Sequence, residues 1–198
     1  CAVKLFGDSM WLRPDGRKTG GSSYFPGNTI EEQQEEITRT IVELHRMGYQ
    51  IGIHSTGGCG IDTIVDAYVK AMELYPGKNL RHFVIHGDDF SEDNMKKCAK
   101  NHIVLSSQAV APWGFMESLV DCVDPEEPSH MFDYQRVMDN GVVVSQGSDA
   151  PCMTVNWLMG LKFAMTRTTV SGTCYNRGNG CTIEAVSYTH LRAHETCA

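Results

Sequence analysis

Five short apolar runs alternate with helix-like segments along this chain of 198 residues. The runs are expected to form strands at residues 2–6, 49–54, 82–86, 103–107 and 142–147. Apolar residues at helical spacing separate them, as at Ile37, Ile41 and Leu44. Strands that alternate with helices pair in parallel, so the pattern predicts an α/β fold built on one parallel sheet.

Two architectures satisfy this alternation: an open doubly wound sheet, and part of a closed (β/α)8 barrel. No Gly-x-Gly-x-x-Gly follows the first run, so a dinucleotide-binding fold is unsupported. Two stretches, 7–26 and 109–130, are rich in turn-forming residues and are expected to be loops. Long loops of this kind often carry function.

The composition excludes several classes of function. The formal net charge is −7 with acidic and basic residues interspersed, which argues against nucleic acid as a partner. No apolar run approaches the ~18–20 residues of a membrane span, so no membrane partner is expected. The eight cysteines form no Cys-x-x-Cys pair, which favours free thiols in a reducing compartment such as the cytoplasm.

Both ends of the chain look incomplete or foreign. The chain starts at Cys1 and not at Met, so the N-terminus is expected to be missing and the compartment is left open. Residues 186–196 (VSYTHLRAHET) resemble one reading frame of a transposon-end adapter used for sequencing libraries. We therefore expect one domain over residues 1–186 and a non-native tail over residues 187–198.

Four ionisable residues lie in or directly after apolar runs: Lys4, His54, His86 and Asp149. Barrel enzymes assemble their active sites at the C-terminal ends of the strands. Imidazoles from adjacent strands suit Zn²⁺, and a carboxylate can hold a metal-activated water and take its proton. Each residue also has a structural alternative: a satisfied polar group for either histidine, a turn for Asp149, and a snorkelling side chain for Lys4.

The other candidates carry weaker signals. His82 lies four strand residues before His86, about 13 Å away, so it is expected in the core or at the opposite barrel mouth. His45 and His102 are expected to be structural, and His130 is undecided. Solvated loop acids are expected at Asp88, Asp89, Glu126 and Glu127.

An ordered set of motifs spans residues 2–186 and resembles the amidohydrolase superfamily, specifically its amidohydrolase-3 branch. The motifs are Val3-Lys4-Leu5-Phe6 with Asp8, Ile53-His54, Arg81-His82-x-x-Ile85-His86, Gly147-Ser148-Asp149-Ala150-Pro151, Ala164-x-Thr166-Arg167 and Thr182-Ile183-Glu184-Ala185. Each motif is weak alone, and the specificity lies in their order and spacing.

The resemblance implies a metal-dependent (β/α)8 barrel that hydrolyses amide-type C–N bonds of a small molecule. The five strands would be barrel strands four to eight. His54 and His86 would match metal ligands on the fifth and sixth strands, and Asp149 the metal-binding acid/base on the eighth. Lys4 would match a metal-bridging lysine that is carbamylated in some members. One or two divalent ions, zinc above all, are implied, and a homo-oligomer is left open.

Departures from the family pattern leave the substrate open. The His-x-His metal pair of the first strand has no counterpart in this chain. Gly57-Gly58-Cys59 stands where Gly-Asp is usual, and Ser9-Met10-Trp11-Leu12 replaces a Gly-Ser-Leu-Gly run. We expect this piece alone to be inactive, and a non-catalytic barrel scaffold or binding module is the alternative function.

Overall fold

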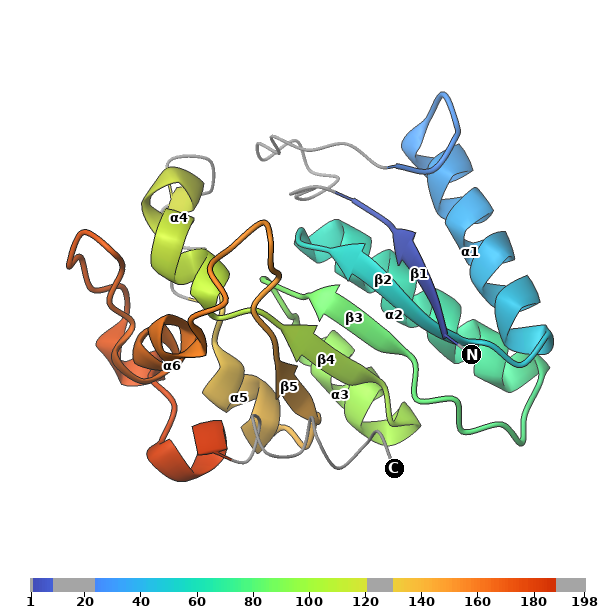
Figure 1. Ribbon diagram of the computed structural model, residues 1–198. Coiled ribbons are helices and arrows are strands. Elements are labelled where there is room, and N and C mark those ends of the chain that lie inside the picture. The colour runs from blue at the N-terminus through green and yellow to red at the C-terminus, as the bar shows by residue number, and fades with distance from the viewer. Residues whose placement is uncertain (1, 9–23, 121–129, 188–198) are drawn as a thin grey trace.

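The computed structural model describes residues 2–8, 24–120 and 130–187 of the chain, as a five-stranded parallel sheet with helices between the strands (Figure 1). The elements are β1 (Ala2–Phe6), α1 (Ile30–Arg46), β2 (Gln50–Ser55), α2 (Gly58–Leu74), β3 (Phe83–His86), α3 (Glu92–Asn101), β4 (Val104–Ser107), α4 (Val110–Val120), α5 (Tyr134–Asp139), β5 (Val144–Gln146) and α6 (Trp157–Thr166). The strands pair in sequence order. The predicted α/β fold is therefore confirmed.

Side-chain caps begin the helices where the sequence favours them. The Thr29 hydroxyl accepts a hydrogen bond from the Glu32 amide at 3.2 Å, and the Glu32 carboxylate accepts one from the Asn28 amide at 2.6 Å. These two bonds satisfy amides that the helix itself leaves free. Ser91 caps α3 in the same way, by accepting from the Asn94 amide.

Helix α4 corrects the prediction of a continuous loop over residues 109–130, since Val110–Val120 is helical. Pro112 lies in its first turn, where a missing amide hydrogen costs nothing. The helix is apolar on most sides and shows no apolar stripe, because it packs against α6 and buries residues such as Met116 and Leu119. Residues 121–129 lie outside the described part of the chain.

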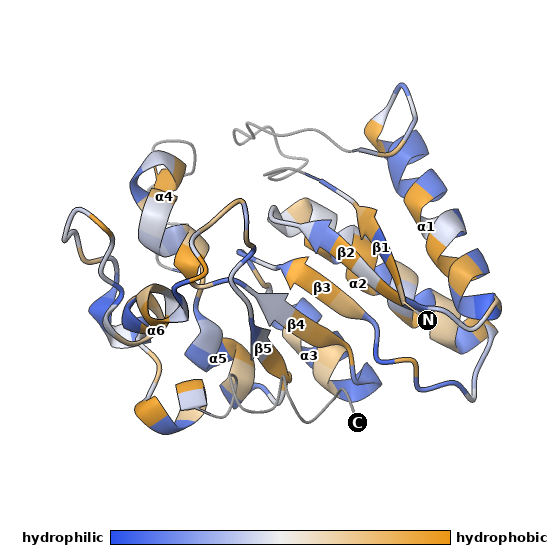
Figure 2. Cartoon of the chain, in the orientation of Figure 1, coloured by the Kyte–Doolittle hydropathy of each residue, from blue (hydrophilic) through white to orange (hydrophobic). Residues whose placement is uncertain are grey.

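One face of the sheet is covered by helices and forms the core. The parallel register places Ile53, Val84 and Leu105 side by side, and all three are completely buried. Helix α1 turns Ile37 and Ile41 toward this layer, and Figure 2 shows the matching alternation of apolar and polar residues along α1. This packing explains why the strands are nearly continuous apolar runs.

The opposite face of the sheet is more open. Its residues include Lys4, Phe6 and, in register with Phe6, His54. The side chain of Phe6 is 53% exposed, and Lys4 is exposed as well. This face and the carboxyl ends of its strands are where the predicted functional residues gather.

Buried histidines lock the amino ends of β2 and β3, as expected for His82 and His45. The Ile51 amide donates to His82 Nδ1 at 3.1 Å, so neutral His82 carries its proton on Nε2. That proton is directed at His45 Nδ1 at 2.8 Å, and His45 Nε2 donates to the Tyr75 carbonyl at 3.1 Å. Every ring nitrogen is satisfied, so the pair is structural.

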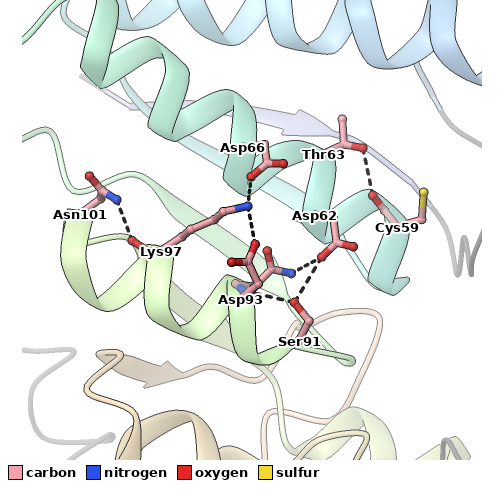
Figure 3. Close-up of polar contacts among 9 residues, drawn as sticks. Cys59, Asp62, Thr63, Asp66, Ser91, Asp93, Lys97 and Asn101 are labelled. Atoms are coloured by element: carbon pink, nitrogen blue, oxygen red, sulfur yellow. Dashed lines mark hydrogen bonds and ion pairs between the residues drawn. The ribbon is translucent and has the colours of Figure 1, made fainter.

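A polar network joins α2 to α3 on the outer surface (Figure 3). Lys97 pairs with Asp66 of α2 and with Asp93 of its own helix. Asp62 accepts hydrogen bonds from Asn94 and Ser91. The network links the outer surfaces of the two helices.

Five of the eight cysteines lie in the described part of the chain. Cys59, Cys98, Cys152, Cys174 and Cys181 are all unpaired. Within the described residues, no helix is both long and apolar enough to cross a membrane.

Candidate metal-binding active site

The imidazoles of His54 and His86 lie against each other at the ends of β2 and β3. Their ring centroids are 4.4 Å apart and the rings are nearly perpendicular. Strict alternation would not bring them together, because His86 pairs with Ser55 and would face the helices. His86 instead has a φ of 74°, a left-handed conformation rare outside glycine. This turn redirects its ring toward His54, and such backbone strain is typical of functional sites.

Both imidazoles are neutral at neutral pH. Burial, and then the charges of His86 and Lys4, lower the pKa of His54 to about 4, against opposing contributions from Asp149 and Asp8. Burial and Lys4 also lower the pKa of His86 to about 4. A neutral imidazole keeps a lone pair, which is the form that binds metal ions.

Lys4 and Asp149 come from opposite edges of the sheet and still interact. In a flat sheet, β1 and β5 would be four strand spacings apart, roughly 19 Å. The charge of Asp149 nevertheless raises the pKa of Lys4, which burial lowers overall. Asp149 lies three residues beyond the end of β5, in the loop that follows it, and its charge therefore lies closer to Lys4 than the strand order alone would suggest. Asp149, like His86, has a left-handed φ, of 55°.

Aromatic rings surround His54 on its open side. The centroid of the Phe6 ring lies 5.3 Å from that of His54, and the Tyr24 ring lies 6.3 Å away. Lys4 Nζ sits 4.8 Å from the centre of the Phe6 ring, a cation–π contact. The mouth of the site is therefore part aromatic and part charged.

Asp88 corrects the expectation of a solvated loop acid, because it is only 8% exposed. Burial, with the charges of Asp8 and Asp89 next in size, raises its pKa well above the usual range. The segment after the second long stretch covers it, since the Phe132 amide donates to the Asp88 carbonyl at 2.8 Å. The local Gly-Asp-Asp sequence gives no sign that the segment around Phe132 buries Asp88.

Arg167 holds that covering segment in place. Its guanidinium is fully buried and donates to the carbonyls of Phe132 at 2.7 Å, Met131 at 2.9 Å and Tyr175 at 3.0 Å. Carbonyl dipoles, rather than a carboxylate, satisfy the charge. The Ala164-x-Thr166-Arg167 motif therefore has a structural explanation.

The donor chemistry fits a divalent metal ion, although it supplies only part of a ligand set. Zinc takes four ligands, mostly His, Cys, Asp or Glu. His54 and His86 offer two neutral imidazoles in contact, and Asp149 and Lys4 act on the same region. Within the described residues, no three His, Cys, Asp or Glu side chains converge closely enough to hold an ion.

Fold and site together define a parallel α/β protein whose ionisable residues gather at the carboxyl ends of its strands. The chain belongs to the amidohydrolase family, whose model matches residues 2–190, and this confirms the resemblance to the amidohydrolase-3 branch. Over 139 residues it is 27% identical to the putative amidohydrolase YtcJ of Bacillus subtilis (strain 168). That alignment covers 67% of this chain and 25% of the relative, so the chain spans about a quarter of that protein's length.

Solved structures share the fold. An uncharacterized metal-dependent hydrolase from Pyrococcus horikoshii OT3 superposes with a TM-score of 0.72 at 16% identity, over 94% of this chain and 38% of that one. One from Pyrococcus furiosus gives a TM-score of 0.69 at 17% identity, with the same coverage.

Proposed function

We propose that this chain forms strands four to eight of a (β/α)8 barrel that hydrolyses small amide-type C–N substrates with the help of a divalent metal. Membership in the amidohydrolase family supports the reaction class. The sequential order of five parallel strands and the more open face of the sheet support the barrel. In this arrangement β1 is barrel strand four and β5 is barrel strand eight.

The contact between His54 and His86 is the observation that carries the proposal. Two neutral imidazoles lie in contact at the strand ends, and a left-handed backbone conformation turns one of them there, which is a kind of strain that clusters at functional sites. His54 and His86 would hold the ion, most readily zinc, with one or two ions as alternatives. Lys4 would serve either as a bridging carbamate or as a cation for the substrate.

A bound divalent ion supplies the lowered pKa of water and the polarisation of the carbonyl. Asp149 would take the proton from the attacking water and deliver it to the leaving nitrogen. As a cation, Lys4 would stabilise the negative charge that the carbonyl oxygen gains. Phe6 and Tyr24 limit access of bulk water to His54.

Zinc titration of the 198-residue chain tests the metal site. We expect weak binding that His54→Ala and His86→Ala each reduce at least about tenfold, since each removes one ligand. His102→Asn is the matched control, because this histidine is exposed at the C-cap of α3, before the amino end of β4, and asparagine tolerates its left-handed backbone. Equal affinities for the wild type and both site variants would refute the proposed ligands.

A further inference from the structure

We propose that Asp8 is a positioning residue, which caps helix α2 from another strand and thereby holds His54 in the site. This proposal rests on the proposed function only in taking His54 as a ligand. Asp8 follows β1 and is completely buried. Asp8 belongs to the Val3-Lys4-Leu5-Phe6 motif at the start of the chain, yet the proposed reaction does not use its carboxylate.

Helix α2 begins without a cap of its own. Its N-cap residue is Gly57, which has no side chain to accept a hydrogen bond, and its first turn contains no acidic residue. Asp8 Oδ1 accepts a hydrogen bond from the Thr56 amide at 2.8 Å. The Gly57 amide also acts on this carboxylate and lowers its pKa. A negative charge here complements the positive end of the helix dipole.

The space for the Asp8 carboxylate exists because residue 60 is glycine. A Cβ on Gly60 would lie 1.8 Å from Asp8 Oδ2 and 2.8 Å from Ser55 Oγ. Within the described residues, these two buried oxygens form no well-aligned hydrogen bond, although the Ser55 hydroxyl lowers the pKa of Asp8. Gly60 in α2 and Asp8 after β1 are therefore fitted to each other.

The backbone of the same segment holds His54. The Gly7 amide donates to the His54 carbonyl at 2.8 Å, and the Asp8 amide lies 3.4 Å from the same oxygen. The backbone of Asp8 also forms a hydrogen bond that raises the pKa of the imidazole. The side chain thus fixes the turn after His54 while the backbone fixes His54 itself.

Nuclear magnetic resonance of the 198-residue chain separates positioning from general stabilisation. The readouts are the nuclear Overhauser effect between the His54 and His86 rings and the exchange rate of the Thr56 amide. Asp8→Ala should abolish the first and speed the second by about tenfold to a hundredfold, because a charge-assisted bond is lost. Asp8→Asn, which keeps the shape and an acceptor oxygen, should restore most of both.

Gly60→Ala should reproduce Asp8→Ala, and the double variant should exchange no faster than either single variant, because all three lose one contact. Ile41→Val lowers global stability away from the site, and Gly178→Ala adds a methyl group in open space. Both controls should keep the ring-to-ring signal. An Asp8→Ala variant with the wild-type signal and exchange rate would overturn the proposal, as would loss of the signal in Ile41→Val.

A zinc titration of the same variants keeps the two proposals apart. Asp8→Ala should weaken zinc binding while Ile41→Val leaves it unchanged. Absence of zinc binding by the wild type contradicts the proposed function alone, because the resonance readouts still decide the role of Asp8.

Discussion

At the scale of single residues, backbone conformation decides which side chains meet. The apolar runs sufficed to predict that His54 and His86 lie at the ends of strands, whereas Lys4 lies in the middle of β1 and Asp149 three residues beyond β5. They could not indicate that His86 reaches His54 through a φ of 74°, because alternation alone turns it the other way. Burial of Asp88 was also beyond the sequence, since it depends on the distant Phe132 and Arg167.

The His45–His82 pair makes stability depend on pH. Burial, then the charge of His45, lowers the pKa of His82 from 6.5 to about 4 in the folded protein. Between these values the unfolded chain binds the proton more readily, so stability falls as the pH falls. His82→Leu should destabilise the protein at pH 7.5, and the gap to wild type should shrink by up to roughly 3 kcal/mol toward pH 4.

Urea unfolding at several pH values measures that gap directly. Taking the difference between the two proteins removes the opposite contribution of Asp8, whose pKa burial raises to about 6. A gap that stays constant from pH 7.5 to pH 4.5 would show that His82 is not held neutral by the fold.

At the scale of elements, the helices that bury one face were predictable and the helix buried on several sides was not. Helices α1, α2 and α3 show caps or apolar stripes along the chain. Helix α4 shows neither, because its partner α6 comes from a segment almost forty residues later. Helix α4 is therefore stabilised by packing against its neighbours, and the periodicity of its sequence does not reveal it.

The contact between α4 and α6 depends on a glycine. A Cβ on Gly160 would lie 2.9 Å from the backbone nitrogen of Val110 and 3.3 Å from the carbonyl carbon of Ala109. The backbone atoms of Ala109 and Val110 cannot move aside as a flexible side chain could. Gly160→Ala should therefore lower the free energy of unfolding by about 1–3 kcal/mol. Gly178→Ala is the control for a methyl group added in open space. Thermal unfolding measures both, and equal stability for the two variants would refute the close packing.

At the scale of the whole molecule, the alternation of strands and helices suffices to predict a parallel α/β sheet. It does not predict whether that sheet is open or belongs to a closed barrel. Alternating strands and helices allow an open sheet and a barrel equally. The interaction between the two ends of the sheet appears only in three dimensions, where the charge of Asp149, after β5, acts on Lys4 in β1. The four predicted residues act on one another in this candidate site, which explains why sequence position alone left their roles open.

The most direct test combines metal content with turnover, in the longest reading frame that contains this chain. The zinc-loaded protein should hydrolyse members of a panel of small amides and lose that activity on chelation. Asp149→Asn should keep at least about half of the zinc but lose a factor of about 10²–10⁴ in rate, because it removes the acid/base. His86→Ala should lose zinc and activity together. Full turnover by Asp149→Asn, or full zinc occupancy in an active His86→Ala, would contradict a metal-dependent hydrolase site at these strand ends.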